Sequence, residues 1–313
     1  MHPTPEHIPG MHFYGHPSLA VPASSPRSPV GVLFLTSVRD IGADDHVGQI
    51  VATDEGPRRM EGIVERTVNE TRSGGALEGI LRVAGVVTDD LSRDLRHSSY
   101  PVIPEPGRDW IHPLDLETTE GQLVVDPRFT INVPSDFRAL PRADRDGRAQ
   151  RKEAFERRVM DIADERGADV IVSDHYMAWI QYMINDQYGR YGRVLNIHPA
   201  VTIPGHPFCF TGKTPTGDAI RHAQTGQPTF TGATLHFVDP EIDHGPPIAV
   251  ASATPVHADD EPERLRYRNY QQSKLPLFIA GMRHYVERIL PQLDALDVNS
   301  LSLLTHDASI RAA

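Results

Sequence analysis

Apolar and polar positions alternate along the chain in two kinds of stretch. Short apolar runs rich in β-branched residues predict strands, and apolar positions spaced three to four apart predict helices. The predicted strands are 30–37, 79–90, 168–173, a strand ending at Asn196, 231–238 and 247–256. The predicted helices are 58–71, 147–166, 179–188, 215–224 and 261–290, the last bent at Pro276. Because strands alternate with helices, we expect an α/β fold with a doubly wound, mostly parallel sheet.

The ends of the chain and one internal segment interrupt this pattern. Residues 1–29 are rich in proline without periodicity, which indicates an irregular arm, and 291–313 form a weakly patterned tail. The domain is expected at 30–290, with 91–145 as an insertion or lid that holds a possible hairpin at 121–133. The arm has four histidines, His2, His7, His12 and His16. With no cysteine or carboxylate at ligand spacing, we expect no metal site there.

Composition limits the classes of partner. The net charge of −11 argues against a broad nucleic-acid-binding face, because clustered Lys and Arg dominate phosphate recognition. One cysteine, Cys209, excludes an internal disulfide. No apolar run approaches the ~20 residues that span a bilayer, and no secretory leader is evident, so a cytoplasmic location is expected. These features favour a small-molecule substrate, with no membrane and no obligate protein partner.

The stretch "RVLNIHPA" places candidate chemistry at a strand end. Asn196 and His198 are two apart, so on a strand they project to the same face, just before Pro199. In doubly wound sheets, ligands bind beyond the carboxyl ends of the strands. We therefore expect both side chains at a binding site.

A second stretch, "TGATLHFVDPEIDHGPPI", contributes His236 and Asp243 around an acidic turn. Each residue alone has an ordinary structural alternative, as a turn former, a core histidine or a solvated loop. Together an amide donor, an imidazole and a carboxylate serve addition to a carbonyl carbon, since they stabilise an oxyanion and move a proton. There is no G-x-S-x-G motif, and Cys209 lies in the apolar "PFCF", so direct transfer is favoured over a covalent intermediate.

These stretches carry a resemblance to a known family. "VLNIHPA", the His236–Asp243 stretch and "ADVIVSDHYMAWI" resemble the formyltransferases that use 10-formyltetrahydrofolate, and "RYRNYQQSKLPLFIAGM" resembles their proline-containing last helix. The family includes glycinamide ribonucleotide transformylase, methionyl-tRNA formyltransferase and formyltetrahydrofolate deformylase. The resemblance implies a Rossmann-like formyltransferase fold and 10-formyltetrahydrofolate as the formyl donor, without a metal.

The resemblance also implies roles for individual residues. Asn196 and His198 would bind the formyl oxygen, and Asp243 would orient His198 and shuttle the acceptor's proton. The folate head would be bound by two segments, Met177, Ala178, Trp179 and Ile180, and Val238, Asp239, Glu241 and Ile242. His236, Lys213 and Thr214 are the candidates for substrate binding. Ala178 stands where the family often has Arg.

The acceptor is inferred by weighing the family's members. The segment 36–49 holds Asp40, Asp44 and Asp45 rather than a Gly/Ser-rich phosphate loop, which favours a cationic amine or hydroxylamine over a phosphorylated substrate. The pattern resembles the hydroxyornithine transformylases of hydroxamate siderophore biosynthesis most. Glycinamide ribonucleotide transformylase, formyltetrahydrofolate deformylase and a folate-binding protein without turnover stay open as alternatives.

Overall fold

The computed structural model describes residues 10–14, 29–37, 47, 50–91, 129–176, 178–184, 190, 192–212 and 214–295. Their main feature is an eight-stranded sheet in the order β1-β10-β9-β8-β7-β2-β5-β6. The strands are β1 Met11–Phe13, β2 Val30–Thr36, β5 Leu81–Thr88, β6 Thr130–Asn132, β7 Val170–Ser173, β8 Val194–His198, β9 Thr229–Phe237 and β10 Pro247–Val256. The two-residue strands β3 Ile50–Val51 and β4 Arg58–Arg59 pair apart from it.

The sheet has a parallel half and an antiparallel half. β8, β7, β2, β5 and β6 run parallel, whereas β9, β10 and β1 are added antiparallel beyond β8. Strand β2 is buried at all seven positions, as expected for a parallel strand covered on both faces. Strand β8 therefore lies at the junction between the two halves, and its carboxyl end carries Asn196 and His198.

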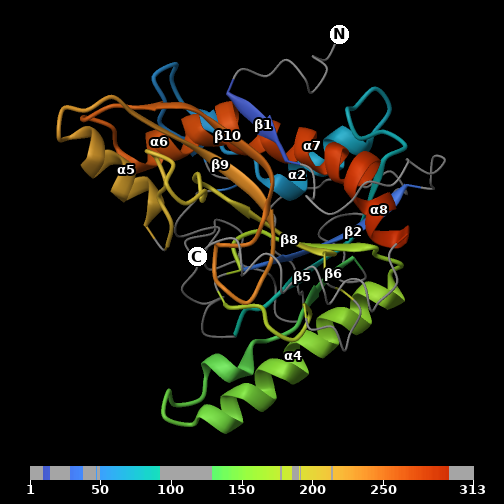
Figure 1. Ribbon diagram of the computed structural model, residues 1–313. Helices are drawn as coiled ribbons and strands as arrows, with labels where there is room; N and C mark the ends of the chain where they lie inside the picture. The colour runs from blue at the N-terminus through green and yellow to red at the C-terminus, as the bar shows by residue number, and fades with distance from the viewer. Residues whose placement is uncertain are drawn as a thin grey trace.

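Helices cover both faces of the sheet (Figure 1), which confirms the predicted α/β, doubly wound class. Helix α4 lies on one face, and α2, α7 and α8 lie on the other. The helices are α2 Ile63–Thr71, α4 Arg145–Glu165, α5 Pro215–Ala223, α6 Pro262–Asn269, α7 Leu275–His284 and α8 Leu290–Ala295. Within the described ranges, no helix is long and apolar enough to cross a membrane.

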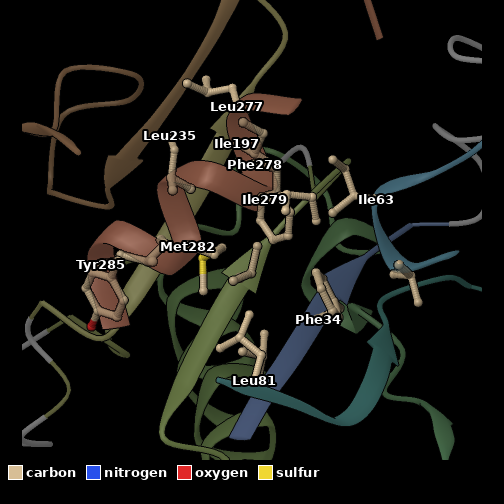
Figure 2. Packing of buried hydrophobic residues seen from close by; sticks show 14 of the residues in the cluster. Phe34, Ile63, Leu81, Ile197, Leu235, Leu277, Phe278, Ile279, Met282 and Tyr285 are labelled. Carbon is tan, nitrogen blue, oxygen red and sulfur yellow. The ribbon is translucent and has the colours of Figure 1, made fainter. Parts of the chain in front are cut away.

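The larger apolar core lies between the sheet and the closing helices. Figure 2 shows Leu277, Phe278 and Met282 of α7 directed at side chains of the strands and of α2. All three are fully buried, and Phe34 of β2 meets Phe278 with ring centroids 6.1 Å apart. A second core packs α4 against the opposite face through Phe155, Val159 and neighbouring residues.

Three local predictions were wrong. Met11–Phe13, inside the expected irregular arm, forms edge strand β1, because its backbone pairs with β10. Arg58 and Arg59 belong to β4, so α2 begins later than predicted. Residues 178–184 form turns rather than the start of a helix, since three of their N–H groups bond to a carboxylate of α4 instead of to the preceding turn.

The closing helix is more irregular than expected, and most of the segment 91–145 is not described. Residues 262–295 are helical but include π-helical turns at Tyr270–Lys274 and Tyr285–Ile289. The first turn ends two residues before Pro276, which lacks the N–H that an α-helical bond needs. In the segment 91–145, residues 92–128 lie outside the described residues, as does most of the predicted hairpin. Its described part adds β6 to the edge of the sheet.

Candidate active site

Strand register brings three polar side chains into one row. Ser173 pairs with Asn196 between β7 and β8, and Asn196 pairs with His236 between β8 and β9. Residues that pair directly across strands lie on the same face of a sheet. The row stands on the face covered by α4, because Leu195 and Ile197 belong to the core on the other face.

His236 fixes the orientation of the Asn196 amide. Asn196 Nδ2 lies 3.0 Å from His236 Nε2, and His236 Nδ1 lies 2.8 Å from the carbonyl oxygen of Phe237. A carbonyl only accepts, so Nδ1 carries the proton and Nε2 accepts from the amide. Burial lowers the pKa of His236 to about 4, which keeps this arrangement neutral. The second N–H of the amide is left for a ligand.

His198 lies between two acceptors. Its Nε2 is 3.4 Å from the carbonyl oxygen of Phe210, and its Nδ1 is 3.5 Å from Asp243 Oδ1. A neutral imidazole has one N–H and serves one of them, whereas the imidazolium serves both. Burial lowers the pKa of His198, and the Asp243 carboxylate opposes that shift. The ring is therefore placed to take up a proton whose charge Asp243 balances.

Asp243 is held in the loop between β9 and β10 by unusual backbone. Its φ is +62°, in the left-handed region that aspartate tolerates better than most residues. Two residues on, a Cβ at Gly245 would lie 1.7 Å from the carbonyl oxygen of Phe237. Only glycine permits this approach, so the "DHG" sequence folds the loop back over β9 and brings Asp243 to His198.

A pocket with about 400 Å³ of empty volume, partly open to solvent, adjoins the row. Two apolar side chains in its wall are exposed, Trp179 at 43% and Ile242 at 61%. Every residue predicted to bind folate lines it except Met177, which lies outside the described residues. The lining is Ser173, Tyr176, Ala178, Trp179, Ile180, Asn196, His236, Val238, Asp239, Glu241, Ile242 and Asp243.

Among the described residues, the predicted substrate-binding residues do not line the pocket together, unlike the residues predicted to bind folate. His236 lines the pocket, but both its ring nitrogens are engaged by protein atoms, which favours a role in orienting Asn196. Thr214 caps the start of α5 and is absent from the described pocket lining. Lys213 and the acidic loop of Asp40, Asp44 and Asp45 lie outside the described residues.

The sequence pattern missed a buried charged cluster beside the row. Lys274 of the closing helix is 1% exposed, and its Nζ lies 2.9 Å from Asp174 Oδ1 and 2.8 Å from the Tyr270 hydroxyl. Asp174 directly follows Ser173, so the cluster lies at the carboxyl end of β7. The Tyr270 hydroxyl also lies 3.0 Å from Nε2 of His175, whose φ is +61°. The available signal was a lysine directly before the apolar run "LPLFIAGM".

The polar side chains of the site are an amide, imidazoles and a carboxylate, which suit proton transfer and oxyanion stabilisation. Within the described part of the chain, no group of three or more His, Cys, Asp or Glu side chains is arranged to hold a metal ion. An amide donor, a buried imidazole and a carboxylate beside an apolar-walled pocket can instead stabilise a developing oxyanion and move a proton.

Comparison with known proteins agrees with this chemistry. Residues 127–279 match the family model described as formyl transferase. The chain is 32% identical over 126 residues to chloroplastic phosphoribosylglycinamide formyltransferase of Arabidopsis thaliana, and 30% identical over 131 residues to phosphoribosylglycinamide formyltransferase of Escherichia coli K12. These matches cover 39% and 41% of this chain, but only 40% and 56% of the relatives.

A solved structure resembles most of this chain. It is PvdF of pyoverdin biosynthesis, described as a structurally unique N10-formyltetrahydrofolate-dependent formyltransferase. The TM-score is 0.72 at 28% identity, over 84% of this chain and 100% of that one.

Proposed function

We propose that the protein moves the formyl group of 10-formyltetrahydrofolate to the side-chain nitrogen of a small substrate, because residues 127–279 match the formyl transferase family model. One observation carries the proposal. Asn196, His198 and Asp243 meet at the carboxyl edge of the sheet, next to a pocket walled by Trp179 and Ile242.

In the proposed reaction, the acceptor nitrogen attacks the formyl carbon, and the bond from that carbon to N10 of the folate breaks. The Asn196 amide donates to the formyl oxygen as it becomes an oxyanion, and His198 supports the same charge. One proton leaves the acceptor nitrogen and one is needed at N10. Asp243, in contact with His198, relays it.

Hydroxyornithine is the proposed acceptor. The resemblance to PvdF spans that entire chain, and PvdF belongs to pyoverdin biosynthesis. A hydroxylamine is largely uncharged at neutral pH, so it attacks without first losing a proton, whereas the ornithine amine arrives protonated. The acidic segment 36–49 also lacks the Gly/Ser-rich character of a phosphate-binding loop.

Glycinamide ribonucleotide is the second candidate acceptor. Its support is the 30–32% identity to two phosphoribosylglycinamide formyltransferases. Those matches cover only 40% and 56% of the relatives.

The test is a parallel assay of the full chain with 10-formyltetrahydrofolate. Hydroxyornithine, ornithine, glycinamide ribonucleotide and no acceptor are compared at equal concentrations, while tetrahydrofolate and formate are both measured. We expect tetrahydrofolate formation with hydroxyornithine to exceed that with ornithine at least tenfold, without formate. Equal or faster turnover of the ribonucleotide would select the second candidate. Formate release independent of any acceptor would show a hydrolase instead.

A further inference from the structure

The pocket wall at residues 178–184 has no secondary structure of its own. Its side chains Ala178, Trp179 and Ile180 line the pocket, yet the backbone here forms only turns. Strand β7 ends at Ser173, so the wall is not held by the sheet. Something else must fix its position, because apolar contact alone leaves a turn free to slide.

The wall is bonded to a buried carboxylate on helix α4. Glu156 is 0% exposed, and its Oε2 accepts from the N–H groups of Gln181 at 3.0 Å, Tyr182 at 2.6 Å and Met183 at 2.9 Å. Three successive N–H groups that converge on one anion form an anion-binding nest. Bonds of this kind are charge-assisted and stronger than those between neutral groups.

The charge of Glu156 is balanced from its own helix. Lys152, one turn earlier, forms an ion pair with Oε1 of Glu156. Its ammonium also lies 6.0 Å from the ring centroid of Phe137 and 5.9 Å from that of Tyr182, near the outer limit of a cation–π contact. A buried carboxylate is tolerated only when paired and hydrogen-bonded, and both conditions are met here.

Packing links the position of these N–H groups to the position of the pocket wall. Ile180 and Met183 are buried in the same core as Phe155, the neighbour of Glu156 on α4. The bonded residues follow Trp179 and Ile180 without a gap in the chain. Moving the nest by an ångström would therefore move the pocket wall with it.

We propose that Glu156 is a positioning residue for the folate-binding wall: its carboxylate, through the N–H groups of residues 181–183, sets where Trp179 and Ile180 meet the bound folate. The proposal rests on the proposed function. It assigns binding, rather than the chemical step, to a residue on the far side of the wall from the ligand.

The test uses Glu156→Gln, which keeps size but replaces a charged acceptor with a neutral amide. Glu153→Gln, one turn earlier on the same helix and paired with Arg157 at the surface, is the matched control. Tetrahydrofolate binding is measured by calorimetry without oxygen. We expect Glu156→Gln to weaken binding about tenfold or more and to raise the KM for 10-formyltetrahydrofolate with kcat nearly unchanged, while Glu153→Gln changes neither.

A second readout needs no ligand. The chain has two tryptophans, so Trp110→Phe isolates the fluorescence of Trp179. In that background, Glu156→Gln should increase quenching of Trp179 by acrylamide. Glu156→Asp keeps the charge, so its quenching should lie between that of the Trp110→Phe parent and that of Glu156→Gln. If Glu156→Gln does not fold, Glu156→Asp decides by the same measurements.

The outcomes separate the two proposals. Wild-type quenching and wild-type affinity in a folded Glu156 variant would overturn the positioning role and leave the proposed function intact. A wild-type protein that binds no tetrahydrofolate would overturn the proposed function, and the folate-binding role of the wall with it.

Discussion

The apolar layer under the closing helices and the carboxyl edge of the sheet are both buried, but they are built differently. In the layer, Phe278 and Met282 belong to one apolar cluster with side chains of several strands (Figure 2). At the edge, His236 and Lys274 each have named partners within about 3 Å. Burial of apolar area is non-directional, whereas a buried polar group depends on its partner. Among the described residues, the non-glycine positions with left-handed backbone, His175 and Asp243, both lie at the edge.

Asp243→Asn should separate the edge from the layer most clearly. The swap keeps size and polarity but removes the charge that faces His198 at 3.5 Å. We expect kcat to fall about 10²- to 10⁴-fold, with folate affinity held within about an order of magnitude. Steady-state kinetics and tetrahydrofolate binding measure the two quantities. A variant with most of its activity would make the acidic turn merely structural.

Phe278→Ala should produce the opposite pattern. Phe278 is fully buried, so truncation leaves a cavity and lowers the free energy of unfolding by roughly 3–5 kcal/mol. Denaturant titration measures this change. Below the new midpoint, kcat of the folded fraction should stay within a few-fold of wild type. A kcat that fell as steeply as stability would mean that the layer and the edge are not separable.

Asn196→Ala tests the row across β7, β8 and β9. We expect kcat to fall about 10²- to 10³-fold, the usual effect of losing one preorganised oxyanion donor, with stability nearly intact. Chemical denaturation confirms the folded state before the rate is measured. Turnover at the wild-type rate would remove Asn196 from the oxyanion site.

Lys274→Met removes a buried charge from the helical segment that also carries Phe278, so its effect on stability can be compared with that of Phe278→Ala. It removes the ammonium beside Asp174 Oδ1 and leaves the buried carboxylate with His175 Nε2, 3.4 Å from Oδ2, as an ionisable neighbour, which should lower the free energy of unfolding by about 3 kcal/mol. Unlike Phe278→Ala, this loss should be largely recovered by adding Asp174→Asn. The control is Arg283→Met, which breaks an exposed pair and should change stability by under about 0.5 kcal/mol. A double variant no more stable than Lys274→Met would refute the pairing argument.

The smallest expected effect is a dependence of the free energy of unfolding on pH, caused by His236. Its pKa is about 4 when folded against 6.5 for the free side chain, so the unfolded chain binds the extra proton first. Stability is therefore full above pH 6.5 and is lost as the pH falls toward 4. Between about pH 7 and 5 the loss should be about 2 kcal/mol. His236→Gln should remove this part of the slope, whereas exposed His257→Gln should leave it.

Much of the fold was readable from local pattern. Periodicity predicted α4, α5 and six of the eight strands of the described sheet, and "VLNIHPA" and "TGATLHFVDPEIDHGPPI" indicated the family whose model matches residues 127–279. Two of the failures share one cause. At 178–184 and at Met11–Phe13, local propensity was overridden by partners far along the chain, Glu156 in one case and β10 in the other.

What the sequence by itself determined is therefore what near neighbours decide: which segments are strands or helices, and that Asn196 and His198 share a face. Tertiary structure alone decided that β9 lies beside β8. This placement lets the Asn196 amide donate a hydrogen bond to His236, 40 residues away. It likewise decided that Lys274 meets Asp174 across 100 residues. Such contacts follow from strand order and from which helix closes over which edge, and both are set by how the whole apolar surface is buried at once.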